Sequence, residues 1–142
     1  MKYCIVYWSR YGNGKKIVDY VEQKLSEKNH EITVFNTDEV DPSSMPDADI
    51  YVFSSPAEAF RVQKNMRTVM KNLKGMDGKK YGIINTHKMN RNWLGSMEKM
   101  LFKKDMEKLA AVDFKMGKEV NEGKGLMEDW QSSLNDFINN LQ

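Results

Sequence analysis

The sequence predicts an α/β fold of three layers, in which a doubly wound, five-stranded parallel sheet lies between two layers of helices. Apolar or alternating segments of strand length recur along the chain, and all except the second precede a segment with apolar residues at helical spacing. No repeat, low-complexity tract or long linker divides the 142 residues. A chain of this length can bury one sizeable core, so residues 1–142 are expected to form a single domain.

The order of elements follows from the spacing of apolar residues along the chain. The predicted strands are residues 3–8, 31–35, 50–55, 81–86 and 111–116. Helices are predicted from about residue 13 to 25, 62 to 73, 93 to 101 and 130 to 141. The second and third strands are joined by a polar loop with room for one short turn of helix.

The chemistry of the strands predicts their order in the sheet. The first, third and fourth strands are continuously apolar, as expected of strands buried on both faces. The second carries Thr33 and the fifth carries Asp113 and Lys115, which suits the edges of a sheet. The order 2-1-3-4-5 places both polar strands outside. The order 3-2-1-4-5 would expose the apolar third strand, so the first order is favoured.

Composition excludes several classes of protein. Lysine and arginine number 22 against 20 acidic residues, and this balance of +2 is too weak and too evenly mixed to indicate nucleic acid. Cys4 is the one cysteine, so neither an internal disulfide nor a cysteine metal cluster is expected. The first apolar run is too short for a signal peptide or a membrane span. We therefore expect a soluble, cytoplasmic protein that does not bind membranes.

Two loops lie where a sheet of this order binds its ligands, beyond the carboxyl ends of the first and third strands. The first, Ser9–Gly14, offers a hydroxyl, two glycines that permit close backbone approach or a positive φ, and the N-terminus of a helix that begins near Asn13. Free N–H groups at such a helix start commonly hold phosphate. The second loop, Ser54–Phe60, contains Pro56, which extends the preceding residue and is expected to keep the loop open.

These features resemble the flavodoxin family over essentially the whole chain. Ser9, Gly12 and Asn13 match positions of the family's phosphate loop, T/S-x-T-G-x-T, and residues 124–141 are similar to its final helix. The resemblance implies the short-chain type, with non-covalent FMN and one-electron transfer between redox partner proteins. It implies that phosphate is held by Ser9, Arg10, Tyr11, Gly12, Asn13 and Gly14. The flavin ring would lie between Ser55, Pro56, Ala57, Glu58, Ala59 and Phe60 on one side and Thr86, His87, Lys88 and Trp93 on the other, with Phe60, Trp93 or neither stacked on it.

The sequence also departs from the family pattern. Tyr11 and Gly14 replace two phosphate-loop hydroxyls, and no large aromatic residue directly follows Pro56. A flavin beside Lys88 or Arg91 would have a higher potential than in acidic relatives. Two alternatives stay open: a module that has lost or weakened flavin binding and acts as a binding or regulatory domain, and an FMN-dependent NAD(P)H reductase. No acid–base or nucleophile pair is visible, which favours an electron carrier over an enzyme with its own catalytic residues.

Overall fold

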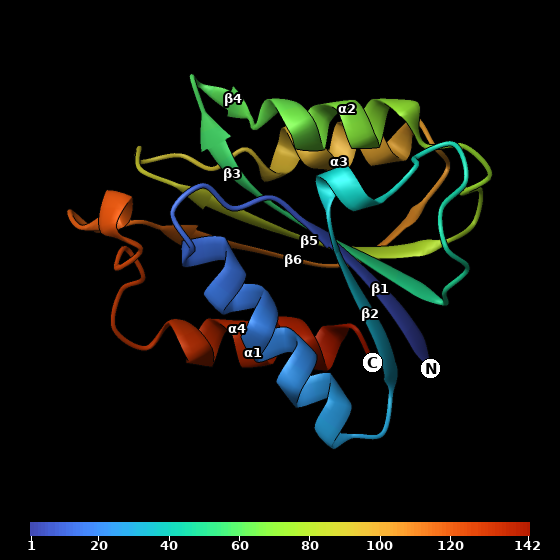
Figure 1. The fold of residues 1–142 in the computed structure, drawn as a ribbon, viewed down its shortest axis with the longest axis horizontal. Helices are drawn as coiled ribbons and strands as arrows, with labels where there is room; N and C mark the ends of the chain where they lie inside the picture. Colours follow the sequence, from blue (N-terminus) through green and yellow to red (C-terminus); the bar gives the residue numbers. More distant parts are fainter.

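A central sheet of five parallel strands organises the molecule in a computed structural model that describes residues 1–142 (Figure 1). The strands lie side by side in the order β2-β1-β3-β5-β6, and a short sixth strand, β4, pairs antiparallel with β3. Their bounds are β1 Lys2–Tyr7, β2 Glu31–Asn36, β3 Ile50–Glu58, β4 Arg61–Val62, β5 Lys80–His87 and β6 Glu107–Lys115. Since β5 and β6 are the fourth and fifth predicted strands, the predicted order is confirmed.

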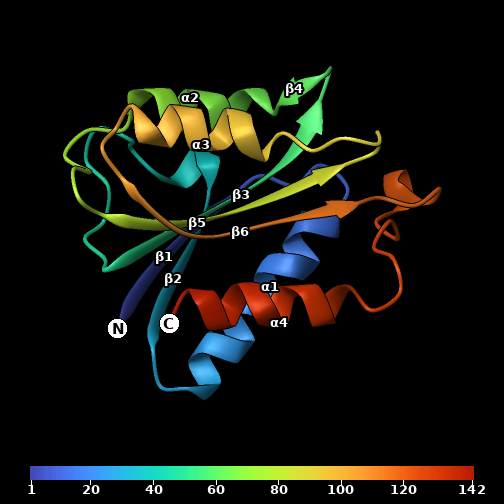
Figure 2. The same ribbon diagram turned by 180° about the vertical axis from the view of Figure 1, so that it is seen from behind.

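Helices cover both faces of the sheet. Figure 1 shows α2 and α3 on one face and α1 and α4 on the other, and Figure 2 shows the same separation from behind. Their bounds are α1 Asn13–Glu27, α2 Lys64–Asn72, α3 Leu94–Phe102 and α4 Trp130–Asn140, with short 3-10 turns η1 Thr37–Glu39 and η2 Val120–Glu122. None of these helices is long and apolar enough to cross a membrane.

The core is divided into two parts by the sheet. On β1, Ile5 contributes to one hydrophobic cluster and the next residue, Val6, to the other. The two clusters contain 17 and 16 buried residues, so both faces of the sheet are buried to a similar extent. This burial explains why β1, β3 and β5 have no polar face, whereas Thr33 and Asp113 lie on the edge strands β2 and β6.

The segment after the third predicted strand differs from the expectation. An open loop over residues 54–60 was expected, but β3 continues to Glu58, turns at Ala59 and Phe60, and returns as β4. Pro56 extends the chain as expected, yet that extension prolongs the strand, and the carbonyl of Pro56 accepts a hydrogen bond from Gln63 N at 3.0 Å. The expectation of an open loop was therefore wrong, because the backbone of these residues forms its hydrogen bonds in a β3–β4 hairpin. The last strand, β6, also begins earlier than predicted, at Glu107.

Candidate functional site

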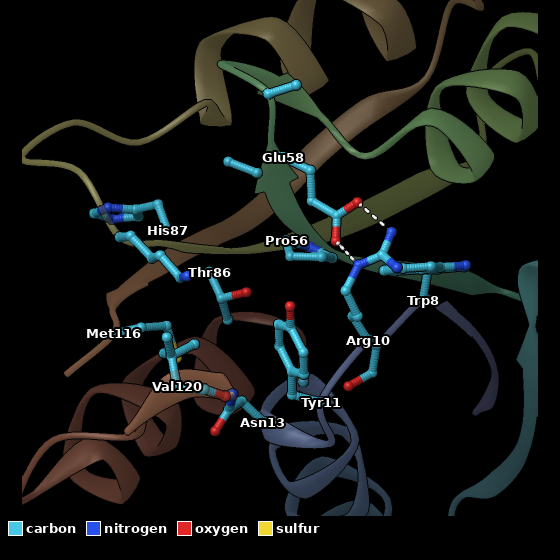
Figure 3. A pocket seen from close by; sticks show the side chains of 15 residues that line it. Trp8, Arg10, Tyr11, Asn13, Pro56, Glu58, Thr86, His87, Met116 and Val120 are labelled. Carbon is cyan, nitrogen blue, oxygen red and sulfur yellow. Dashed lines mark hydrogen bonds and ion pairs between the residues drawn. The ribbon is translucent and has the colours of Figure 1, made fainter. Parts of the chain in front are cut away.

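A pocket of about 300 Å³ lies beyond the carboxyl ends of β1, β3 and β5, where the winding of the sheet reverses (Figure 3). Three segments that the sequence predicted to meet there do so. They contribute residues 9–11, 13 and 14 after β1, residues 56–59 at the end of β3, and residues 86–88 at the end of β5. Met116 and Val120, which follow β6, complete the wall.

The loop Ser9–Gly14, for which a phosphate role was expected, has a positive φ at one of its two glycines. Gly12 has a φ of +97° and ends the loop directly before α1, which begins at Asn13. Ser9 Oγ accepts hydrogen bonds from the N–H groups of Gly12 at 3.1 Å and Lys15 at 3.3 Å. Its own hydroxyl hydrogen is left to donate to a ligand.

The first two N–H groups of α1 stay free. Asn13 and Gly14 line the pocket and are buried, and no protein group accepts a hydrogen bond from either backbone N–H. The first turn of any helix lacks intrahelical partners for these donors, and its dipole is positive at this end. The start of α1 is therefore able to bind an anion inside the pocket.

The side chain of Asn13 has a different role from the one expected. Its Nδ2 donates to the Val120 carbonyl at 2.8 Å, and its Oδ1 accepts from Gly125 N at 2.8 Å. Lys16 Nζ donates to the Gly123 carbonyl at 2.6 Å. The carboxamide of Asn13 thus ties the segment 117–129 to the start of α1 through one donor and one acceptor.

An ion pair spans the pocket between the loop Ser9–Gly14 and the end of β3. Arg10 donates to both carboxylate oxygens of Glu58, from Nε at 2.6 Å and from a terminal nitrogen at 2.8 Å (Figure 3). The guanidinium carbon lies 4.7 Å from the centre of the Trp8 ring, within the range of a cation–π contact. Glu58 raises the pKa of Arg10, so the guanidinium stays charged.

Two aromatic rings reach the pocket, and both come from the loop that follows β1. Trp8 lies beneath Arg10, and the Tyr11 side chain points toward Pro56 (Figure 3). Tyr11 is 43% exposed, so its ring can still gain contacts from a ligand.

The wall at the end of β5 carries Thr86, His87 and Lys88. His87 is 5% exposed, and its Nδ1 and Nε2 lie 2.7 Å from the Met89 carbonyl and 2.6 Å from Asp113 Oδ2. Lys88 donates to Asn121 Oδ1 at 3.1 Å. The structure contains no group of three or more His, Cys, Asp or Glu side chains that could hold a metal ion.

Four of the sixteen predicted site residues do not line the pocket, namely Gly12, Ser55, Phe60 and Trp93. Ser55 is buried, and its hydroxyl donates to the Pro56 carbonyl at 2.9 Å. Phe60 is 72% exposed at the tip of the hairpin. Trp93 packs in the core, its indole Nε1 donates to the Phe60 carbonyl at 2.9 Å, and Arg91 lies 4.6 Å above its ring. Neither candidate stacking ring, nor Arg91, faces the pocket.

Sequence reasoning missed three residues of the wall, Trp8, Met116 and Val120. Trp8 could have been found, because the first side chain beyond a parallel strand commonly faces the crevice. Met116 closes the predicted strand 111–116, and the same argument applies to it. Val120 lies in a segment without helical or strand periodicity, so the sequence holds no comparable signal for it.

Comparisons with known proteins give a consistent result. No family model matches the chain, and no curated protein matches it in sequence. Among solved structures, a flavodoxin from the domain Archaea is similar over 100% of both chains, with a TM-score of 0.72 and 15% identity. The two-electron reduced flavodoxin of Megasphaera elsdenii is similar over 97% of this chain and 96% of its own, with a TM-score of 0.76 and 14% identity.

A third structure, the flavodoxin of Streptococcus pneumoniae TIGR4, has 20% identity and a TM-score of 0.75 over 99% of this chain and 97% of its own. At these identities the likeness concerns the fold. It agrees with the strand order and with the helices on both faces of the sheet. The chain therefore has the flavodoxin-like fold, as its resemblance to that family implied.

Proposed function

We propose that this chain binds FMN in the pocket beyond β1, β3 and β5 and carries electrons between redox partner proteins. The observation that carries the proposal is that Asn13 and Gly14, two buried residues that line the pocket at the start of α1, have backbone N–H groups without a protein acceptor. Such donors need an acceptor, and a phosphate group suits both them and the helix dipole. The similar solved structures are flavodoxins, one of them in its two-electron reduced form.

The phosphate end of FMN fits these residues, with fewer donors than the family pattern has. The hydroxyl of Ser9 and the two free N–H groups can donate to phosphate oxygens, whereas Tyr11 and Gly14 lack the short hydroxyls of the pattern. Each missing charge-assisted hydrogen bond lowers the affinity by roughly 1–3 kcal/mol. The affinity for FMN is accordingly expected to be lower than a complete phosphate loop would give.

The ring end of FMN fits the remaining wall. Tyr11 offers an aromatic face. Apolar contacts are offered by Pro56, Ala57, Ala59 and Met116, and polar ones by Thr86 and Lys88. Bound FMN would supply the one- and two-electron redox chemistry. The residues of the chain would hold it, exclude water and set the local charge. The positive charge of the Lys88 ammonium would stabilise the anionic reduced form of the flavin. The midpoint potential of the bound flavin is therefore expected to be higher.

Binding is tested by the visible absorption spectrum of the purified protein, followed by titration of stripped protein with FMN and with riboflavin. A yellow protein, or quenching of FMN fluorescence that saturates in the micromolar range, supports the proposal. Ser9→Ala is expected to lower the affinity for FMN by about tenfold, because it removes one hydrogen bond to the phosphate. The affinity for riboflavin, which has no phosphate, should fall much less. Ser132→Ala, an exposed serine on α4, is the matched control and should change neither.

The electrostatic part is tested by the midpoint potential of the flavin-loaded protein. Lys88→Gln should lower that potential, because it removes a positive charge beside the cofactor. Lys71→Gln, at the far end of α2, removes an equal charge at a distance where salt screens it, and should leave the potential unchanged. Equal potentials in the wild type and both variants would contradict the assigned role of Lys88.

One observation favours the alternative of a module that no longer binds flavin. The two later loops bring no aromatic ring to the pocket, because Trp93 is buried in the core and Phe60 points away. A colourless protein that does not bind FMN even at millimolar concentration would support this alternative and overturn the proposal of an electron carrier.

A further inference from the structure

The strongest polar contact across the pocket joins two residues that the phosphate-loop pattern does not require. Arg10 lies in the loop after β1, Glu58 ends β3, and two hydrogen bonds of 2.6 and 2.8 Å connect them. Both residues line the pocket, as do Asn13 and Gly14, whose backbone N–H groups have no protein acceptor. The ion pair therefore stands beside the place where an anion is expected.

The surroundings allow Arg10 to change its partner. Its side chain is 49% exposed and that of Glu58 is 28% exposed, and ion pairs in contact with water contribute little net stability. The third guanidinium nitrogen forms no hydrogen bond with the protein. Trp8 supports the guanidinium from one side at 4.7 Å, which holds the group close to the phosphate loop without neutralising it.

A phosphate group competes well with a carboxylate for such a donor. It carries up to two negative charges, and the forked guanidinium binds phosphate and carboxylate with the same two-bond geometry. The positive end of the α1 dipole also attracts a phosphate in the pocket. The Glu58 carboxylate forms its hydrogen bonds with Arg10 and none with the first turn of α1.

We propose that Arg10 and Glu58 form a latch that opens for ligands carrying a phosphate group: Arg10 leaves Glu58 and binds the phosphate. The latch rests on the proposed function, since it names the selectivity of that same pocket. A ligand without phosphate leaves Arg10 on Glu58, so the end of β3 stays tied to the phosphate loop. Arg10 offers the phosphate a charged donor in place of the two short hydroxyls that Tyr11 and Gly14 replace. Glu58 competes with the phosphate for Arg10 and so sets the phosphate concentration at which Arg10 changes partner.

The experiment uses inorganic phosphate as the probe and the NMR signal of the Arg10 Nε–H group in the wild-type protein as the readout. Addition of phosphate should shift this signal along a saturating curve, whereas sodium chloride at equal ionic strength should not. In Glu58→Gln the curve should saturate at about two- to five-fold lower phosphate, because the competing charge is gone. FMN affinity should rise by a similar factor, with riboflavin affinity unchanged.

A charge swap separates a ligand role from a merely structural one. The double variant Arg10→Glu and Glu58→Arg can form the same ion pair with its polarity reversed. If the ion pair only holds the two segments together, the double variant should bind phosphate with the affinity of the wild type. That result would overturn the latch. The latch predicts at least a tenfold loss, because the residue at the phosphate loop is then an acid.

The outcomes distinguish this inference from the proposed function. An Arg10 signal that ignores phosphate overturns the latch, whether or not FMN binds. A signal that responds to phosphate in a protein that binds no flavin supports the latch and overturns the electron carrier. FMN and riboflavin bound with equal affinity, in the wild type and in Glu58→Gln alike, overturn the latch and leave flavin binding in place.

Discussion

His87 Nε2 lies 2.6 Å from Asp113 Oδ2, and this contact ties the end of β5 to the edge strand β6 at the wall of the pocket. The other ring nitrogen lies 2.7 Å from the Met89 carbonyl, which can only accept a hydrogen bond. Because a carboxylate oxygen can only accept, the contact with Asp113 requires an N–H on Nε2. The ring is 5% exposed, so water cannot easily replace either partner.

Removal of the Asp113 carboxylate should therefore destabilise the fold. Asp113→Ala leaves a nearly buried N–H donor without an acceptor, and we expect a loss of about 1–3 kcal/mol in the free energy of unfolding. Asp113→Asn keeps an acceptor oxygen and should lose less. Urea unfolding of the three proteins measures both values. Equal stability of Asp113→Ala and the wild type would mean that the contact is not formed in solution.

The Asn13 side chain gives a second prediction, about the segment 117–129. Asn13→Ala removes the hydrogen bonds to the Val120 carbonyl and the Gly125 N–H, both of which the fold relies on to hold that segment. We expect a loss of about 1–3 kcal/mol, because Gly125 is buried. Hydrogen exchange at the Gly125 amide should accelerate by at least about tenfold, which reports local opening of the segment.

Asn13→Asp is the matched control for that segment. Its carboxylate still accepts from Gly125 N but cannot donate to the Val120 carbonyl, so exchange at Gly125 should stay slower than in Asn13→Ala. If the two variants exchange equally fast, the bond to Gly125 is not what holds the segment.

Strand order was the most predictable feature of the fold, because it depends on burial alone. A strand buried on both faces is disfavoured by polar residues such as Thr33 or Asp113 near its centre, which predicted that these strands lie at the edges. The hairpin after β3 was not predictable in this way. Its turn residues, Ala59 and Phe60, are not the glycine and asparagine that normally mark a turn with two positive φ angles.

The candidate site was predictable where backbone geometry decides it and unpredictable where side-chain direction does. The two glycines and the start of the helix predicted the position of the loop Ser9–Gly14. Trp93 was expected as a possible stacking ring, but at the start of an amphipathic helix the same residue can turn inward, and here it packs in the core. The use of Asn13 depends on a distant segment, which no local pattern reveals.

The hairpin turn gives a third prediction. Ala59 and Phe60 have φ angles of 51° and 62°, in the left-handed region that side chains with a Cβ disfavour. Replacement of the pair by Asn-Gly should stabilise the protein by about 1 kcal/mol in urea unfolding. Phe60→Ala alone removes the exposed ring without relief of the backbone and should change stability by less than about 0.5 kcal/mol. A double variant no more stable than Phe60→Ala would show that the turn is not strained.

Two glycines in different surroundings give a fourth prediction, of opposite signs. A Cβ at Gly82 on β5 would lie 2.6 Å from Leu141 Cδ2 and 2.9 Å from Phe137 Cζ, so these two buried side chains must move. Gly82→Ala should cost about 1–3 kcal/mol. A Cβ at Gly95, in α3, would meet nothing within 4 Å, and Gly95→Ala should gain about 0.5–1 kcal/mol of helix propensity. Thermal unfolding measures both, and a neutral Gly82→Ala would argue against the close packing of α4 on β5.

The thiol of Cys4 gives the last prediction, on reactivity and on pH. Cys4 is fully buried in β1, and burial raises its pKa to about 11, although a hydrogen bond with Thr33 opposes part of this shift. At pH 8 a shift of about two units leaves roughly a hundredfold less thiolate than in a free cysteine. Labelling with a thiol reagent should therefore be at least about a hundredfold slower in native protein than in urea, and the chain has no other cysteine to confuse the signal.

The same shift predicts how stability changes with pH. Between the unfolded pKa of about 8.5 and the folded value, the folded protein keeps the proton that the unfolded chain loses. The unfolded state then binds fewer protons, so the free energy of unfolding falls as the pH rises from about 8.5 toward 11. Cys4→Ala, which has no titrating group there, should show a shallower fall in urea unfolding over this range. Parallel pH profiles for the two proteins would contradict the raised pKa, since the thiol would then titrate alike in both states.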